Sequence, residues 1–361
     1  MLALERLALV VAIAGAAAGC THFSQDRHEV LVRNPRAGVF DDPVEADVHA
    51  SAQWQYAALA DFAYEKARLR AAEDADRTLT PTEEKLPASC GPVERPPVPP
   101  AWRQWDDFPS PQLEQAMRER GLYLLVVERE TAPREIAVVF EGTNFKEKQD
   151  WKSNFHWLLR FLPHFEDQYT LTARRVAREF FERLRGQPGR YAMSPQDETL
   201  RHPGGEPIRI VTTGHSLGGG LAQQFAYTFH QEPATGKGPH VSEVYAFDPS
   251  PVTGWSTAPD PPRSHNAHGL VIKRIYEHGE VLAYIRLFTS RLTTSPEHPA
   301  IWEFRYNFDP KLNIIRNHSM RSLACGLYLA GRQRAPHGIV QPSISATGPA
   351  ASADQAQGAA R

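Results

Sequence analysis

The amino-acid sequence predicts an α/β fold, in which helices cover both faces of a mostly parallel sheet. From Gly121 onward, short apolar runs typical of buried strands alternate with longer segments of helical periodicity. One strand-to-helix junction, at residues 208–223, also carries a serine between two glycines. Parallel strands need crossover connections, usually helices, that cover both faces of the sheet, so this alternation favours the parallel arrangement.

The overall composition limits the class of protein. With 361 residues, the chain can form one large α/β domain or two smaller ones. The net charge of −2 gives no electrostatic basis for nucleic-acid binding, and we expect no nucleic-acid partner.

The first twenty residues have the features of an export signal. Residues 7–18 form an apolar run that is too short to span a membrane comfortably and is followed by small residues. Residues 17–20 (Ala-Ala-Gly-Cys) resemble a bacterial lipobox, so we predict a signal peptide at residues 1–20 with a lipidated Cys20 at its cleavage site. The following threonine indicates the periplasmic face of the outer membrane. An ordinary signal peptide, and with it a secreted protein, is the alternative.

We predict one catalytic domain at residues 46–335, with a tether at residues 21–45 before it and a disordered tail at residues 336–361 after it. Residues 46–74 have the apolar spacing of an amphipathic helix. Residues 80–111 form a Pro-rich insertion, in which consecutive prolines exclude both a helix and a central strand.

Further elements follow from periodicity and from breaks at glycine and proline. Strands are predicted at residues 121–130, 135–141, 241–247, 270–276 and 301–306, the first two as a hairpin and the last as an edge strand. Helices are predicted at residues 168–185 and 317–330, and a loop at residues 252–267. Cys90 and Cys325 could form a disulfide in an oxidising compartment or remain two separate thiols.

The junction at residues 208–223 has the sequence form of a nucleophile elbow. A β-branched run leads into Gly214, His215, Ser216 and, after Leu217, Gly218, and a helical pattern follows. A Cβ at either flanking glycine would collide with the neighbouring strand and helix. The elbow holds the Ser216 hydroxyl clear of the sheet at a helix N-terminus, where the helix dipole favours developing negative charge.

A serine hydroxyl needs a general base, an acid that orients the base, and donors for the tetrahedral oxyanion. In chains with this elbow, the acid and then the histidine follow the serine. His318 stands near the C-terminus at the start of a predicted helix, and we predict that it is the base. Glu280 and Asp248 both follow predicted strands and both remain candidates for the acid.

The oxyanion hole needs two backbone N–H groups. One belongs to the residue after the nucleophile, Leu217. The other comes from a loop after an earlier strand, and the strand at residues 135–141 ends at a glycine that is followed by Thr143. We therefore predict the Thr143 N–H as the second donor.

These motifs resemble the class 3 lipase family, over about residues 46–330. Residues 213–219 (Thr-Gly-His-Ser-Leu-Gly-Gly) are similar to the family's elbow, and residues 138–143 to its strand and oxyanion turn. Residues 244–252 stand where the family has a Gly-x-Pro-Arg-Val turn, and residues 273–281 resemble the segment with the catalytic aspartate, with Glu280 in its place. Residues 318–320 (His-Ser-Met) resemble the histidine motif.

The resemblance implies an α/β-hydrolase fold and a lipase or esterase that cleaves carboxylic esters of lipids through an acyl-enzyme. It ranks Glu280 before Asp248 as the acid, and it implies that residues 155–165, which are rich in aromatic side chains, are a candidate lid. We expect no metal and no cofactor, and a lipid or small ester as substrate. Phospholipase A-type or acyltransferase activity, and a non-catalytic envelope lipoprotein that uses the fold as a binding scaffold, are the alternatives.

Overall fold

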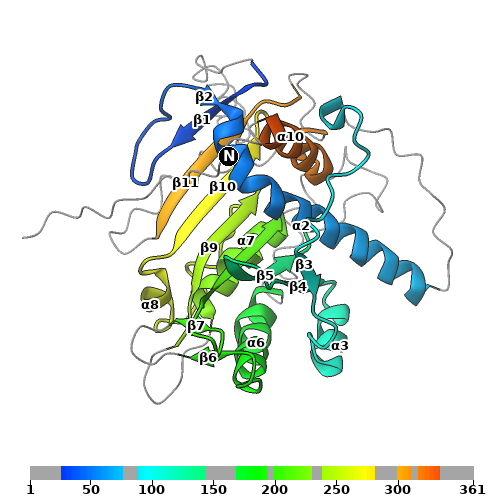
Figure 1. Cartoon of the computed structure of the whole chain (residues 1–361), viewed down its shortest axis with the longest axis vertical. Helices are drawn as coiled ribbons and strands as arrows, with labels where there is room; N and C mark the ends of the chain where they lie inside the picture. Colours follow the sequence, from blue (N-terminus) through cyan, green and yellow to red (C-terminus); the bar gives the residue numbers. More distant parts are fainter. Residues whose placement is uncertain are drawn as a thin grey trace, which may run out of the picture.

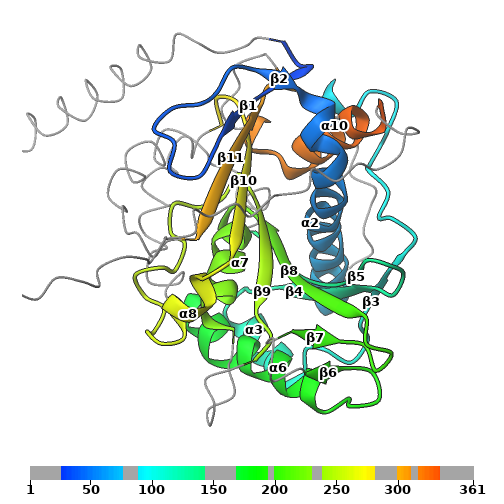
Figure 2. The same cartoon turned by 60° about the vertical axis from the view of Figure 1, so that its left-hand side comes forward.

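The predicted α/β fold is confirmed by a computed structural model, which describes residues 26–75, 88–142, 168–193, 199–229, 238–280, 299–309 and 316–333. One twisted sheet forms its centre, and helices pack on both sides (Figures 1 and 2). The predicted signal peptide with Cys20, residues 143–167 and the tail at residues 336–361 lie outside the described residues.

The strands of the sheet follow one another in a single path. In spatial order they are β2 (Val44–Glu45), β1 (Glu29–Arg33), β11 (Ala300–Tyr306), β10 (Val271–Glu277), β9 (Val241–Phe247), β8 (Pro207–His215), β5 (Arg134–Phe140), β4 (Leu124–Arg129) and β3 (Trp102–Gln104). The short strands β6 (Ala192–Met193) and β7 (Leu200–Arg201) attach to β8. From β11 to β5 all neighbours are parallel, and the strands at both ends are antiparallel. The C-terminal ends of the five parallel strands therefore share one edge, where catalytic groups gather in such sheets.

Helices cover the sheet in two groups. One face packs against α2 (Ala46–Asp74) and α10 (Met320–Gln333), with the short η1 (Ala88–Cys90) beside α10. The other face packs against α3 (Pro111–Glu119), η4 (Thr172–Val176), α6 (Ala177–Arg185), α7 (Leu217–Thr228) and α8 (Arg263–Ala267). The helix predicted at residues 46–74 has these same bounds in the structure.

Strand β5 shows why the sheet must be covered on both sides. Its side chains alternate between the two faces, because successive residues of a strand point in opposite directions. Ile136, Val138 and Phe140 join the core under α6 and α7, whereas Ala137 and Val139 join the core under α2 and α10. All five side chains are buried.

Three expectations are corrected. Residues 29–33, part of the predicted tether, form β1 within the sheet, because Val30 and Val32 are buried against the core under α2. Because β1 pairs with β11, the strand predicted at the edge is an inner one. In the Pro-rich insertion, β3 follows the consecutive prolines and pairs with β4 as the last strand of the sheet, so these prolines occupy no central strand. The predicted loop at residues 252–267 contains α8.

A disulfide joins the two cysteines that the sequence left open. Cys90 in η1 and Cys325 in α10 are bonded, across a sequence separation of 235 residues. Both side chains are fully buried. The bond fixes the segment before β3 against the last helix of the described chain.

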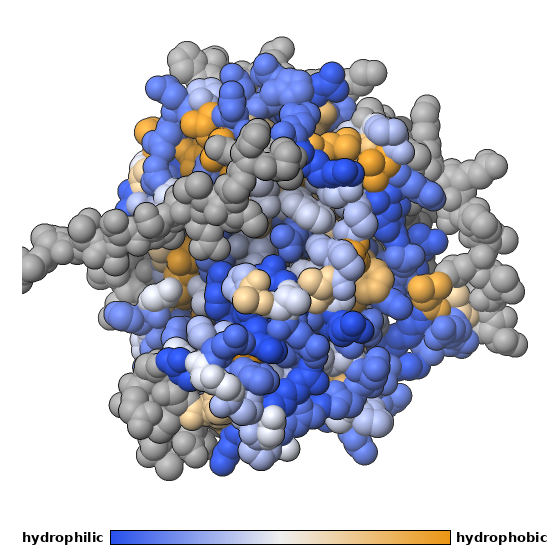
Figure 3. All heavy atoms as spheres, in the orientation of Figure 1, coloured by the Kyte–Doolittle hydropathy of each residue, from blue (hydrophilic) through white to orange (hydrophobic). Residues whose placement is uncertain are grey.

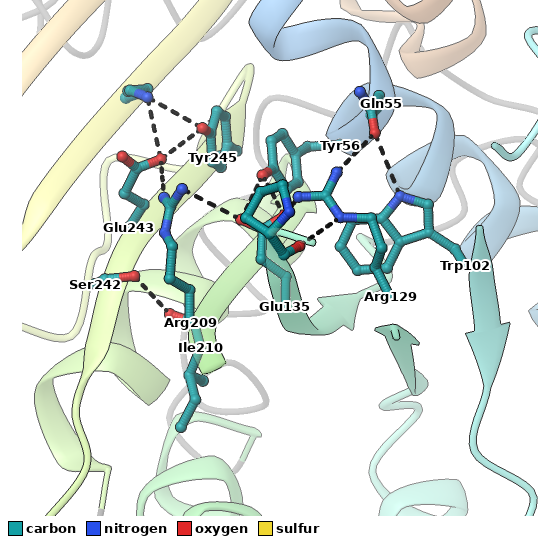
Figure 4. A network of polar contacts seen from close by, with 12 residues as sticks. Gln55, Tyr56, Trp102, Arg129, Glu135, Arg209, Ile210, Ser242, Glu243 and Tyr245 are labelled. Atoms are coloured by element: carbon teal, nitrogen blue, oxygen red, sulfur yellow. Dashed lines mark hydrogen bonds and ion pairs between the residues drawn. The ribbon is translucent and has the colours of Figure 1, made fainter. Parts of the chain in front are cut away.

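A ladder of alternating charges crosses the sheet at the edge opposite the C-terminal strand ends (Figure 4). Arg129 pairs with the fully buried Glu135, whose other oxygen lies 3.5 Å from Arg209 Nη1. Arg209 Nη2 lies 3.0 Å from Glu243 Oε2, and Lys273 Nζ lies 3.1 Å from the same oxygen. Each carboxylate thus lies between two cations, which offsets the cost of removing its charge from water.

The surface drawn in Figure 3 is mainly hydrophilic, with hydrophobic residues in separate groups. Among the described residues, the large hydrophobic side chains that are exposed are Val39, Val44, Val48, Leu69 and Val252. None of the described helices has the length and apolar character needed to cross a membrane.

Candidate active site

The junction between β8 and α7 has the geometry of a nucleophile elbow. Ser216 lies between the two elements with φ 56° and ψ −121°, in the region that side chains other than glycine seldom adopt. Its N–H donates to the Phe247 carbonyl oxygen of β9 at 2.9 Å, which holds the turn against the neighbouring strand. The strained turn places Ser216 at the N-terminus of α7.

Gly214 and Gly218 allow three elements to meet at this turn. A Cβ on Gly214 would lie 2.5 Å from the Gly218 backbone and 2.7 Å from the Phe140 carbonyl oxygen. A Cβ on Gly218 would collide with the same oxygen of β5 and lie 2.7 Å from the Glu141 backbone. Any side chain at either position would therefore push the elbow away from the end of β5.

His318 lies between Ser216 and Glu280. Its Nε2 is 3.0 Å from Ser216 Oγ, and its Nδ1 is 3.0 Å from Glu280 Oε2. The histidine ends the 3₁₀ turn η6 (Arg316–His318), directly before α10. Ser216 is 3%, His318 6% and Glu280 0% exposed, so the three groups are shielded from bulk water.

Asp248, the other candidate acid, faces a different histidine. It follows β9 with φ 39°, and its Oδ2 lies 3.6 Å from His215 Nε2. Its Oδ1 accepts the Glu277 N–H at 3.1 Å. Of the two acids that the sequence left open, the structure therefore places Glu280 at hydrogen-bond distance from His318 and Asp248 behind His215.

The surroundings of these groups favour their neutral forms. Burial lowers the pKa of His215 to about 4, which leaves this imidazole neutral at physiological pH. Burial also raises the pKa of Glu277 to about 8, in opposition to an Asp309 N–H that donates to Glu277 Oε1 at 2.9 Å. Burial lowers the pKa of His278 to about 4.

Of the two predicted oxyanion donors, the structure describes one. Leu217 is the first residue of α7, so its N–H is among those at the helix N-terminus that have no partner within the helix. Thr143 lies outside the described residues, which reach Gly142 on that side. A Cβ on Gly142 would lie 3.2 Å from Ser216 Cβ, so the chain passes close to the serine just before Thr143. The predicted lid at residues 155–165 also lies outside the described residues.

One group of described residues has distances compatible with a metal ion. Ligand atoms of His215, Asp248 and His318 all lie within 4.8 Å of one another. Both nitrogens of His318 are already engaged, one by Ser216 and one by Glu280. The arrangement therefore fits acid–base chemistry at the serine better than it fits a metal centre.

Sequence reasoning did not find Tyr64. This residue of α2 places its hydroxyl oxygen 2.7 Å from His215 Nδ1. The helical spacing of residues 46–74 indicated only packing against the core, and no local pattern distinguishes a tyrosine that reaches a site 151 residues away.

The central strands are parallel, and Ser216 lies on a strained turn between a strand and a helix. The histidine and the acid come from segments later in the chain. Together these features define an α/β-hydrolase. The family model described as Lipase (class 3) matches residues 137–258, which confirms the predicted resemblance to class 3 lipases and supports a lipase- or esterase-like hydrolase. The matched range contains Ser216 and Asp248, and it ends before Glu280 and His318. No curated protein and no solved structure matches the chain.

Proposed function

We propose that this protein cleaves carboxylic esters of lipids, with Ser216 as the nucleophile, His318 as the base and Glu280 as the orienting acid. The observation that carries the proposal is the continuous chain of two 3.0 Å contacts from Glu280 through His318 to Ser216. In this arrangement Glu280 accepts a hydrogen bond from the Nδ1–H of His318, and the lone pair of Nε2 is free to take the serine proton.

The reaction follows from these positions. The Ser216 oxygen attacks the ester carbonyl while His318 takes its proton, and the Leu217 and Thr143 N–H groups stabilise the oxyanion. His318 then gives the proton to the departing alcohol, and an acyl-enzyme remains. A water molecule, deprotonated by His318, attacks the acyl carbonyl carbon, and His318 then returns the proton to the Ser216 oxygen as the carboxylic acid leaves.

An apolar acyl group is supported by the surroundings of the elbow. The Ser250 N–H donates to the Ser216 carbonyl oxygen at 2.9 Å, so this turn lies against the serine. Two residues further on, Val252 exposes 37% of its surface, which makes it one of the few large apolar side chains that the described part presents to solvent. An exposed valine on the segment that begins at this turn suits a hydrocarbon chain better than a charged one.

Substitution of Ser216 by alanine tests the proposal. Ser216→Ala should lose about 10⁶-fold in kcat on a p-nitrophenyl ester, since removal of the nucleophile of a triad has an effect of this size. Ser242→Ala is the matched control, because its hydroxyl bonds the Ile210 carbonyl oxygen at the opposite edge of the sheet. Undiminished hydrolysis by Ser216→Ala would refute the assignment. Absence of labelling of the wild-type serine by a fluorophosphonate would instead indicate a non-catalytic scaffold.

The substrate class requires product analysis. We propose triacylglycerols and related acyl esters, in line with the class 3 lipase match. Wild-type protein incubated with a triglyceride and with a phospholipid should release fatty acid from the triglyceride. Release from the phospholipid alone would indicate a phospholipase A-type enzyme, and transfer of the acyl group to an added alcohol in preference to water would indicate an acyltransferase.

We further propose that the protein is exported and held at the periplasmic face of the outer membrane by a lipid on Cys20. The support is the sequence of residues 1–20. Mass spectrometry of the membrane-extracted protein should find Cys20 as the modified N-terminus. A Cys20→Ser variant should accumulate unprocessed, whereas cleavage of that variant with release into the medium would indicate an ordinary signal peptide.

A further inference from the structure

Tyr64 enters the site from behind the elbow. It stands on α2, on the face of the sheet opposite α7, and its hydroxyl oxygen lies 2.7 Å from His215 Nδ1. The two rings meet edge to face, with centroids 5.6 Å apart. The residue that it contacts directly precedes the nucleophile Ser216.

The same hydroxyl also meets the end of β5. A Cβ on Gly142 would collide with the Tyr64 hydroxyl oxygen and with the His215 carbonyl oxygen. Burial raises the pKa of Tyr64 well above its usual value, so the hydroxyl keeps its proton. The Tyr64 hydroxyl oxygen therefore lies in close contact with both Gly142 and His215.

The protonation states of the two side chains are compatible with a hydrogen bond from Tyr64 to His215. Because Tyr64 keeps its proton and burial keeps the His215 ring neutral, the Tyr64 O–H can donate to an unprotonated His215 Nδ1. The neutral imidazole then carries its proton on Nε2, which faces Asp248 Oδ2 at 3.6 Å. Burial lowers the pKa of His215 to about 4, in agreement with a ring that stays neutral and accepts at Nδ1.

Asp248 contributes to this arrangement through an unusual backbone. It has a positive φ of 39°, which places its carboxylate behind His215 and away from hydrogen-bond distance of His318. Asp248 Oδ2 and His215 Nε2 are both buried without a hydrogen-bond partner in the described part, and they face each other at 3.6 Å. Tyr64 therefore contacts one nitrogen of the His215 ring, and Asp248 lies opposite the other.

We propose that Tyr64 is a positioning residue for the oxyanion hole. Through one hydroxyl it contacts both Gly142, just after β5, and His215, which lies two residues before the proposed oxyanion donor Leu217. The position of the Leu217 N–H relative to the end of β5 therefore depends on this contact. The inference rests on the proposed function, because it concerns the same serine and the same oxyanion.

The reason for a kinetic effect is geometric. Oxyanion donors act only within a narrow range of distance from the developing charge, and a misplacement of about 1 Å can cost about 10²-fold in rate. Loss of the tyrosine oxygen removes the bridge but leaves both donors and the triad in the chain. The expected effect is therefore smaller than the 10²–10³-fold loss that follows removal of a donor itself.

Tyr64→Phe removes one oxygen atom and tests the proposal. We expect kcat to fall about 10- to 10²-fold with KM unchanged, because the oxyanion exists in the transition state and not in the bound ester. Affinity for an alkyl boronic acid, which forms a tetrahedral adduct with Ser216, should fall by a similar factor. Tyr56→Phe is the matched control: it lies on the same helix, and its buried hydroxyl bonds Glu135 at 2.9 Å on the opposite edge. That variant should keep both values within about twofold of wild type.

A double-variant cycle separates positioning from a general loss of structure. His215→Ala removes the acceptor of the same hydrogen bond, so adding it to Tyr64→Phe should lower kcat by less than the product of the two single effects. A merely structural tyrosine would lower the melting temperature of Tyr64→Phe and leave kcat and boronic-acid affinity at the wild-type values, and this result would overturn the proposal. Failure of the proposed function would differ, because the wild type itself would then show no Ser216-dependent hydrolysis and bind no boronic acid.

Discussion

Replacement of Glu280 by glutamine should separate the orientation of the base from the nucleophile itself. Glu280 Oε2 lies 3.0 Å from His318 Nδ1, and both side chains are almost completely buried. At this distance, an effective dielectric constant of about 20 gives about 5.5 kcal/mol of attraction between the carboxylate and an imidazolium. That energy corresponds to about 10⁴-fold in rate, which is also the loss found when the acid of a serine triad becomes an amide.

The comparison with Asp248→Asn decides which acid orients the base. Asp248 lacks a hydrogen bond to His318 in the described structure and faces His215, so its charge can act on His318 only through space. We expect kcat of Asp248→Asn to fall by much less than that of Glu280→Gln, for which the expected loss is about 10⁴-fold. Steady-state kinetics on a soluble p-nitrophenyl ester measure both, and fluorophosphonate labelling shows that Ser216 is present and folded. An Asp248→Asn variant that is slower than Glu280→Gln would refute the assignment of Glu280.

Three other predictions concern stability. Replacement of both Cys90 and Cys325 by alanine should lower the free energy of unfolding by up to about 5 kcal/mol in urea titrations, because the bond closes a loop of 235 residues; an unchanged urea midpoint would contradict this. Glu135→Gln should lower the free energy of unfolding by about 3 kcal/mol in the same assay and leave kcat unchanged, because two arginines of the charge ladder lose their buried partner. A decrease of less than about 0.5 kcal/mol would show that the ladder does not stabilise the fold. Burial raises the pKa of Glu277 from 4.5 to about 8, so the folded protein binds this proton more tightly than the unfolded chain does. The resulting contribution of Glu277 to the free energy of unfolding is complete below pH 4.5 and is lost as pH rises to 8. Glu277→Gln should therefore be less sensitive to pH between 5 and 8 than the wild type, and equal slopes of unfolding free energy against pH would argue against the raised pKa.

The parts of the fold that the sequence predicted are those with a local cause. The strand, turn and helix around Ser216 form one continuous pattern, because the glycines of the elbow and the β-branched run before it act within a few residues. The bounds of α2 followed from apolar spacing in the same way. Chain order then directed attention to His318, which the structure places 3.0 Å from the serine.

The parts that the sequence missed depend on distant partners. β1 is five residues long, and it becomes a strand because it pairs with β11, whose residues lie more than 260 positions later. Its charged ends, Glu29 and Arg33, gave no sign of a buried strand. The positions of Glu280 and Asp248 did not separate them, because both follow strands of the same parallel sheet, β10 and β9, and only the resemblance to class 3 lipases ranked Glu280 first. The acid that orients the base is the one whose side chain the backbone turns toward His318. The backbone at Asp248 has a positive φ, which the sequence does not reveal.

Helix α2 explains how so distributed a site can hold its geometry. Tyr56 and Tyr64 lie eight residues apart, about 12 Å along a helix, and they reach the two opposite edges of the sheet. Between these two tyrosines, Asp61 accepts a hydrogen bond of 3.0 Å from Nε of Arg321. Arg321 lies in α10, three residues after His318. One rigid helix therefore contacts the elbow that bears the serine and the helix that follows the histidine. Ser216 and His318 come from segments that lie 102 residues apart in the sequence. Contacts of both segments with α2 therefore fix the distance between the two side chains better than the loops around them could do alone.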